Sequence, residues 1–269
     1  MCPVKREEDE NYLAQDDHKP DDYIHSPGKL YLVGIGSGNS RQITPQALET
    51  ILKAEVVVGY GEYLRLIKNL LAYKLVISSG MCQEVERAEL AIQEAQNGKI
   101  VAVISSGDAG IYGMAGLVLG LLQKKSLDVA VEVVPGITAA SLAAASLGAP
   151  LMNDFAVISL SDLLTPWALI ERRLQSAAQG DWVIVIYNPK SNHRTRQIEQ
   201  AQSICLQHRR PDTPVGIVQK AGREDEKRII SNLAEFLKEP IDMSTTVIIG
   251  NSQTIVYKEM LITPRGYQI

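Results

Sequence analysis

Apolar and polar residues alternate along the chain in two periods, and the two patterns follow one another in a regular order. Short β-branched runs predict strands, and segments with apolar residues three or four positions apart predict amphipathic helices. We expect strands at residues 29–33, 55–59, 74–77, 99–103, 129–134, 155–160, 182–187, 215–219 and 245–250. We expect helices at residues 63–71, 84–97, 114–122, 167–178 and 197–207, with others after Thr44 and after the 135–140 turn. This order predicts an α/β protein, with short antiparallel strands at its end.

The regular order is interrupted once, at residues 148–153, where Gly148 and Pro150 stand close together. Glycine and proline at such a break are typical of a connection between domains. We therefore predict two α/β domains, residues 29–149 and 150–269, with a cleft between them.

The first 28 residues have few apolar side chains and no periodicity, so we expect a disordered acidic extension. Residues 1–25 carry eight acidic and three basic side chains, and the whole chain has a net charge of −4. The remainder is therefore close to neutral. It can hold an anionic ligand, but it is not basic enough to indicate nucleic acid as a partner.

The stretch from Ile104 to Gly113 follows a buried strand and precedes a helix, and it contains Gly107, Asp108 and Gly110. Glycine lets the backbone turn sharply and lets a ligand lie against it. The following helix directs free N–H groups to the same place. We interpret the stretch as a ligand-binding loop, and the alternative is a tight turn whose glycines only serve packing.

The glycines that follow the first strand, Gly34, Gly36 and Gly38, come close to a dinucleotide-binding fingerprint. The third glycine stands one position too early, and Asn39 occupies the place that the motif reserves for it. The acid expected at the end of the second strand is also missing, because Glu55 begins that strand. These departures disfavour an NAD-linked Rossmann oxidoreductase.

The cysteines and histidines form neither a metal site nor a disulfide framework in the sequence. The three cysteines, Cys2, Cys82 and Cys205, are far apart, and the four histidines are scattered. We expect no metal and a reducing, cytoplasmic compartment. We also expect no secretory signal and no membrane partner, because glycines and prolines interrupt the most apolar window, residues 131–152.

Several of these motifs together resemble the tetrapyrrole methylases, which use S-adenosylmethionine on a two-domain fold. The motifs are the glycine loops 34–38 and 107–113 and the segments 134–138 and 246–250. Segments 104–119, 159–167 and 262–267 are similar to members that methylate carbon 17 of precorrin-3B or cobalt-factor III and contract the ring in cobalamin biosynthesis. The resemblance covers about residues 29–269. Ser37 departs from it, since the family usually has proline there.

The resemblance implies a mostly parallel first sheet, a mixed second sheet and an active-site cleft between them that holds folded S-adenosylmethionine. The residues that it implies for cofactor binding are Gly107, Asp108, Gly110, Ile111, Tyr112, Thr138, Ala139, Tyr187, Asn188, Ala221 and Thr246. Backbone groups and one carboxylate can orient a zwitterionic sulfonium without burying a strong net charge. The alternative is that Tyr187 only ends a strand and Thr246 only fills one.

The resemblance also implies a tetrapyrrole substrate whose carboxylates require basic anchors. The residues that it implies for the substrate loop are Gly36, Ser37, Gly38, Ser159 and Ser161. The polar residues that could act as base or anchor are Asp162, Lys220 and Arg223, with His193 and Glu224 as further candidates. We expect segments 159–167 and 263–267 to face the cleft.

The resemblance alone implies a homodimer. Two alternatives to this enzyme stay open beside the disfavoured oxidoreductase. One is a precorrin methylase that acts at a different ring carbon, and the other is a tetrapyrrole carrier that kept the fold without the activity.

Overall fold

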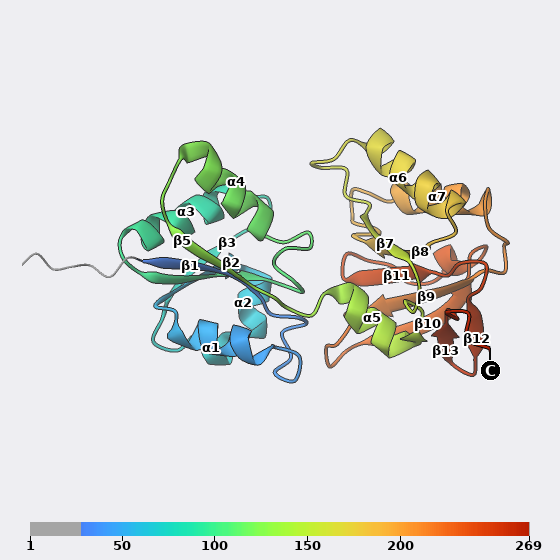
Figure 1. Ribbon diagram of the computed structural model, residues 1–269, viewed down its shortest axis with the longest axis horizontal. Coiled ribbons are helices and arrows are strands. Elements are labelled where there is room, and N and C mark those ends of the chain that lie inside the picture. Colours follow the sequence, from blue (N-terminus) through green and yellow to red (C-terminus); the bar gives the residue numbers. More distant parts are fainter. Residues whose placement is uncertain (1–27, 269) are drawn as a thin grey trace, which may run out of the picture.

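The computed structural model describes residues 28–268, which form two domains lying side by side (Figure 1). The first domain contains β1 (Lys29–Gly34), α1 (Pro45–Lys53), β2 (Val56–Tyr60), α2 (Gly61–Leu66), η1 (Lys68–Leu70), β3 (Leu75–Ser79), α3 (Glu84–Gln96), β4 (Ile100–Ser105), α4 (Ala115–Lys125) and β5 (Ala130–Val134). The rest of the chain contains α5 (Ala139–Leu147), β6 (Gly148–Ala149), β7 (Phe155–Ser159), α6 (Trp167–Gln179), β8 (Val183–Tyr187), α7 (Arg196–Leu206), β9 (Pro214–Gln219), β10 (Lys227–Asn232), η2 (Phe236–Lys238), β11 (Thr245–Ile249), β12 (Ile255–Tyr257) and β13 (Met260–Ile262). The predicted acidic extension, apart from Gly28, lies outside the described residues.

The first sheet is parallel throughout, with the strand order β3-β2-β4-β1-β5, which confirms the predicted parallel sheet. Its two faces are both covered by helices, α3 and α4 on one side and α1 and α2 on the other (Figure 1). Leu30 and Leu32 of β1 pack toward α3 and α4, and Val33 packs toward α1. Burial on both faces explains why these strands are nearly continuous apolar runs in the sequence.

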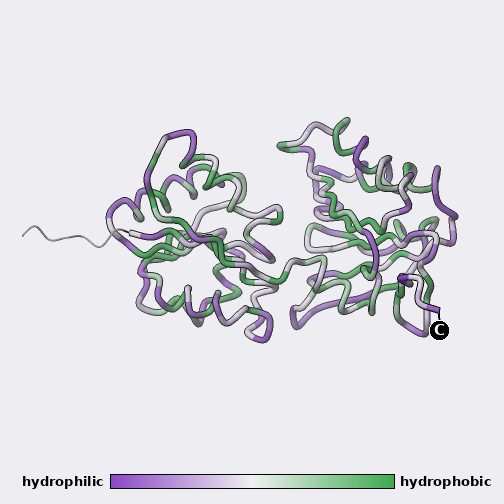
Figure 2. Tube along the Cα trace, in the orientation of Figure 1, coloured by the Kyte–Doolittle hydropathy of each residue, from purple (hydrophilic) through white to green (hydrophobic). Residues whose placement is uncertain are grey.

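The second sheet is mixed, as predicted, and has the order β10-β9-β11-β8-β7. Only β7 and β8 run parallel, and the other neighbours are antiparallel. Helices α6 and α7 cover one face, around the buried side chains of Leu174 and Ile198. The hydropathy of the trace follows this layering, because apolar residues gather on the strands of both sheets (Figure 2).

Helix α5 covers the other face of the second sheet, although the predicted division at residue 149 assigns it to the first domain. Its residues Ala140, Ala143 and Leu147 pack against Val183 and Val218. Strand β6, which follows at once, pairs with β13 in a small third sheet. We therefore propose that the boundary falls nearer residues 135–138, before α5.

The structure differs from the sequence prediction at two places. Strand β10 was not predicted, because Lys227 and Arg228 at its start are exposed and only two isoleucines follow. The helix expected at 63–71 is α2, which begins at Gly61 and ends at Leu66 and is followed by the short η1.

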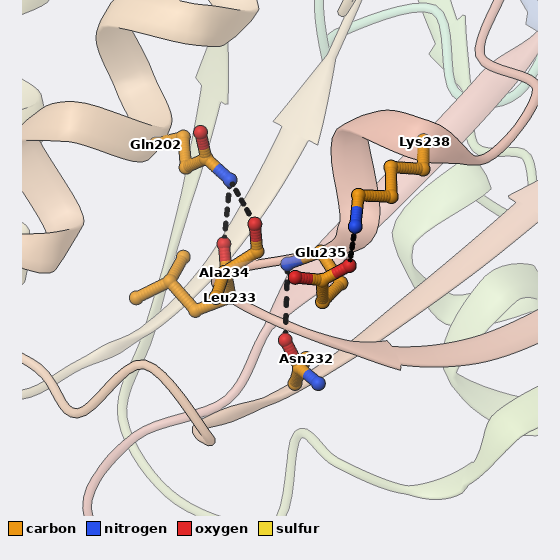
Figure 3. Close-up of polar contacts among 6 residues, drawn as sticks. All are labelled: Gln202, Asn232, Leu233, Ala234, Glu235 and Lys238. Carbon is orange, nitrogen blue, oxygen red and sulfur yellow. Dashed lines mark hydrogen bonds and ion pairs between the residues drawn. The ribbon is translucent and has the colours of Figure 1, made fainter.

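The segment after β10 is held to α7 by a polar cluster (Figure 3). The side-chain amide of Gln202 donates to the carbonyl oxygens of Leu233 at 2.7 Å and Ala234 at 3.1 Å. The Asn232 side chain accepts from the backbone N–H of Glu235 at 3.0 Å. These bonds satisfy the backbone of an irregular connection, so the cluster supports the fold of the second domain.

Candidate active site

Three loops meet at the carboxyl edge of the first sheet because β4, β1 and β5 are neighbours there. The loops after β1 and β4 exchange two backbone hydrogen bonds between Gly36 and Gly107, with N···O distances of 3.0 and 2.8 Å. The loop after β5 packs against them through Gly136, beside Gly34. Ligands of open α/β sheets bind at this edge, which makes it the candidate site.

The glycines of these loops divide into two groups. A Cβ on Gly136 would lie 2.1 Å from the carbonyl oxygen of Gly107, and one on Gly113 would lie 2.5 Å from that of Ala109. These two glycines let backbone segments lie in direct contact, which is the packing role that the sequence analysis gives as the alternative. Gly110 differs, because it is exposed and a Cβ there would meet only an Asp108 oxygen, at 3.2 Å. The space beside the Gly110 peptide is therefore open to a ligand.

Asp108 uses both carboxylate oxygens to join two of the loops. Its Oδ1 accepts from the N–H of Gly110 at 2.8 Å, and its Oδ2 accepts from the N–H of Gly136 at 2.9 Å. A carboxylate that accepts backbone N–H groups makes strong, charge-assisted hydrogen bonds. Asp108 thus fixes the loop after β4 on the loop after β5.

Tyr187, at the end of β8, reaches the start of α5. Its hydroxyl oxygen accepts from the N–H of Ala140 at 2.6 Å and shares a hydrogen bond of 2.5 Å with the Thr138 hydroxyl. Burial raises the pKa of Tyr187, so the phenol stays protonated at neutral pH. The side chain therefore satisfies an N–H that the first turn of a helix leaves unpaired.

Tyr112 joins the loop after β4 to strand β7 of the second domain. Its hydroxyl donates to the carbonyl oxygen of Val157 at 3.3 Å and accepts from the N–H of Ser159 at 3.2 Å. Its ring centroid lies 5.8 Å from that of Tyr187. The Asn188 side chain donates to Ser159 Oγ at 2.9 Å, so five residues predicted from the sequence meet here. We call this group the cofactor cluster, after the cofactor site that the sequence predicts for Tyr112, Thr138, Tyr187 and Asn188; its fifth member, Ser159, was predicted for the substrate loop.

A cavity of about 550 Å³ lies beside the loop after β1. Its lining consists of Ser37, Gly38, Asn39, Ser40, Ile43, Leu48, Leu66, Asn69, Leu70, Lys220, Arg223, Glu224 and Asp225. The first domain supplies the glycine loop and an apolar wall. The second supplies residues 220–225, which we call the charged loop because two basic and two acidic side chains of it line the cavity. Lys220 is paired with Asp225, and the hydrogen bond from Lys220 lowers the pKa of that carboxyl group.

The remaining predicted residues lie elsewhere. Asp162 is exposed, does not line the cavity, and accepts from the Gln197 side chain at 2.7 Å. Ser161 donates its N–H to Ser159 Oγ at 3.2 Å, next to the cofactor cluster. Thr246 is buried in β11, and Ala221 stands in the charged loop beside Lys220. The structure therefore groups Ser37, Gly38, Lys220, Arg223 and Glu224 around the cavity, and it does not bring Asp162 to them.

The closing segment 263–267 does not face the other domain. The Thr263 hydroxyl is buried and shares a hydrogen bond of 2.9 Å with that of Thr254, just before β12. The C-terminal end lies on the side of the second domain that points away from the first (Figure 1). The expectation that this segment faces the cleft was wrong.

Sequence reasoning missed Arg194, which donates to the carbonyl oxygen of Asn188 at 2.6 Å. Partial burial lowers the pKa of Arg194, and the nearby charge of Asp162 opposes that effect. It also missed Gln42 and Gly222, which contact each other across the two domains. Because this contact joins residues that are distant in sequence, no local pattern predicts it. The only local signal was Gly222 itself, a glycine in the short loop between β9 and β10.

Two negative findings apply to residues 28–268. No group of three or more histidine, cysteine, aspartate or glutamate side chains in that range is arranged to hold a metal ion. Over the same range, no helix combines the length and the apolar character that crossing a membrane requires.

Residues 29–237 match the family model described as Tetrapyrrole (Corrin/Porphyrin) Methylases. The chain is 52% identical to a Priestia megaterium protein named cobalt-factor III methyltransferase, over 245 residues that make up 90% of this chain. The chain spans only 45% of that protein's length. The chain is also 49% identical to a Salmonella typhimurium protein named probable cobalt-factor III C(17)-methyltransferase, over 240 residues that make up 89% of this chain. The match covers 100% of the length of that protein.

Solved structures agree with this match. The crystal structure of the methyltransferase CobJ superposes with a TM-score of 0.82 at 30% identity, covering 88% of this chain and 100% of that one. A uroporphyrin-III C-methyl transferase from Thermus thermophilus, complexed with S-adenyl homocysteine, superposes with a TM-score of 0.63 at 25% identity, covering 83% and 97%.

Proposed function

The chain belongs to the tetrapyrrole methylase family, and on that premise we propose that it methylates carbon 17 of precorrin-3B or cobalt-factor III. The reaction contracts the ring and gives precorrin-4 or cobalt-precorrin-4 in cobalamin biosynthesis. The observation that carries this proposal is the 49% identity to a C(17)-methyltransferase relative whose whole length is covered. The cofactor is S-adenosylmethionine.

The described residues fit this cofactor. The peptide at Gly110 is open to a ligand, and Ile111 and Tyr112 beside it are 41% and 60% exposed. Thr138, just before α5, and the half-buried ring of Tyr187 complete a site with polar and aromatic groups and no unpaired charge. We propose that the cofactor cluster, together with the Gly107–Tyr112 loop and Ala139, holds it, with Ala221 and Thr246 as further contacts.

We propose the cavity as the place where the substrate carboxylates bind. One wall carries Lys220 and Arg223 together with Glu224 and Asp225, and within it Lys220 is paired with Asp225. The other wall supplies apolar surface from Ile43, Leu48 and Leu66. A tetrapyrrole combines an apolar ring with peripheral carboxylates, and arginine binds a carboxylate as a fork. Lys220 and Arg223 are therefore proposed as anchors, with Gly36, Ser37 and Gly38 as the substrate loop.

When bound, S-adenosylmethionine supplies the methyl group. The chain's task is to hold carbon 17 in line with that group and to exclude water, which requires placement more than a strong base. Proton removal during ring contraction still requires an acceptor. Asp162 stays a prediction for this role, since it lies outside the cavity and bonds Gln197.

Methyl transfer from a cofactor labelled with carbon-13 tests the proposal directly. Incubation with metal-free or cobalt-loaded substrate, followed by mass and NMR analysis of the product, is expected to place the label on carbon 17 and to show carbon 20 extruded. A label on another ring carbon with the ring intact would make the protein a different precorrin methylase. Substrate binding without any methyl incorporation would favour the carrier alternative. The family match leaves the oxidoreductase alternative without support.

We also propose a cytoplasmic homodimer. Cysteine use supports the compartment, because the described cysteines, Cys82 and Cys205, are free thiols. Resemblance supports the dimer. Sedimentation at micromolar concentration is expected to give about twice the chain mass of 29.5 kDa, and a single monomeric species would contradict the proposal.

A further inference from the structure

Ser37 is the residue at which this chain departs from its family, and the structure gives its hydroxyl specific partners. The side chain is 4% exposed. Its Oγ lies 3.0 Å from the carbonyl oxygen of Gly222 and 2.5 Å from Oε1 of Gln42, and it accepts from the N–H of Asn39 at 3.1 Å. One hydroxyl has one proton to donate. Ser37 can donate its proton to Gly222 when the Gln42 amide is turned so that its NH₂ group donates to Ser37.

The Gly222 peptide is held from both sides. Its N–H donates to Glu226 Oε2 at 2.5 Å, and Oε1 of that carboxylate accepts from Ser146 of α5 at 2.5 Å. Gly222 has a φ of +77°, and a Cβ there would lie 2.2 Å from the Gln42 side chain. Glycine is therefore required for this contact. The contact is also the point where a loop of the first domain meets one of the second.

Both loops line the cavity. Ser37 and Gly38 belong to the wall from the first domain, and Lys220 and Arg223 stand on either side of Gly222 in the wall from the second. The hydrogen bond from Ser37 to Gly222 thus fixes the separation of the two walls. Proline, which the family usually has here, would stiffen the glycine loop but could not donate to Gly222.

We propose that Ser37 is a positioning residue that holds the charged loop, with Lys220 and Arg223, at the correct distance from the glycine loop for a polycarboxylate tetrapyrrole. It acts on substrate affinity through Gly222, while the cofactor cluster stays as it is. This role rests on the proposed function, but the hydrogen bond itself can be tested without turnover.

Amide hydrogen exchange of residues 220–226 tests the hydrogen bond in the full chain, in wild type and in the Ser37→Ala, Ser37→Pro and Ser176→Ala variants. Both Ser37 variants are expected to exchange about five to ten times faster there, because they lose the hydrogen bond from Ser37 to Gly222, the one Ser37 bond that reaches this loop. Ser176→Ala is the matched control, since its hydroxyl bonds within α6. If the alanine variant fails to fold, the proline variant gives the same test, because it too lacks the hydroxyl.

Kinetics test the consequence. Ser37→Ala is expected to raise KM for the tetrapyrrole about five- to tenfold, with kcat and the Kd for S-adenosylhomocysteine changed less than twofold. Unchanged exchange at 220–226 would overturn the proposal, and so would an equal loss of cofactor and substrate affinity. An enzyme that turns over no tetrapyrrole, yet shows faster exchange in the Ser37 variants, would refute the proposed function and leave the interdomain contact standing.

Discussion

A Gly136→Ala variant is expected to lose about 3 kcal/mol or more of its free energy of unfolding, because the added methyl group meets backbone. The Cβ would lie 2.1 Å from the carbonyl oxygen of Gly107 and 2.6 Å from the backbone of Gly34. Neither neighbour can turn away as a side chain could, so the loops after β1, β4 and β5 must separate. Chemical denaturation is expected to show the loss, and titration calorimetry to show weaker binding of S-adenosylhomocysteine.

Gly120→Ala provides the control for this prediction. Gly120 lies within α4, and a Cβ there has nothing within 4 Å. Alanine in a helix interior is expected to stabilise the protein by up to about 1 kcal/mol. The two substitutions add the same methyl group and should act in opposite directions. Equal denaturation midpoints for Gly136→Ala and wild type would show that the three loops are not packed as described.

Local patterns in the sequence were sufficient for the strands that are buried on both faces, such as β1 and β4, because their apolar runs are visible without knowledge of the fold. They were not sufficient for β10, whose first residues are exposed. The loops after β1 and β4 had to lie at one edge because the strands are parallel. The sequence therefore placed Gly107 and Gly110 at that edge, and their role in binding stays a prediction.

Contacts between distant residues were beyond the sequence. Asp108 was expected to contact the cofactor, and no local rule indicates that its second oxygen binds an N–H 28 positions away at Gly136. Helix α5 follows β5 directly, and only its packing against Val183 and Val218 shows that it covers the second sheet. The same limit applied to the contact between Ser37 and Gly222.

Knowledge of the family added what the geometry does not contain. A cavity with Lys220 and Arg223 on one wall fits many polycarboxylates, and the choice of carbon 17 comes from the relatives alone. The structure nevertheless places two groups of residues apart that the motifs mix. The cofactor cluster lies around Tyr187 and Ser159, and the proposed substrate anchors lie on the charged loop.

An Asp108→Asn variant is expected to bind S-adenosylhomocysteine about ten to a hundred times more weakly, because one charge-assisted hydrogen bond to backbone is lost. The carboxylate accepts from two N–H groups, those of Gly110 and Gly136. Asparagine offers one oxygen and one NH₂ group in the same shape, so a donor then faces a donor. The loop after β4, which carries the open Gly110 peptide, is then no longer held to the loop after β5, which leads to Thr138.

Two measurements distinguish this structural role from direct contact with the cofactor. If Asp108 holds the loops, the variant without ligand melts at a lower temperature than wild type, whereas a residue that only touches the cofactor leaves that temperature unchanged. Asp128→Asn serves as the control, since it removes a charge from an exposed position before β5. Wild-type affinity in Asp108→Asn would show that the link between the two loops is dispensable. A loss of affinity with an unchanged melting temperature would restore the original expectation that the carboxylate orients the cofactor itself.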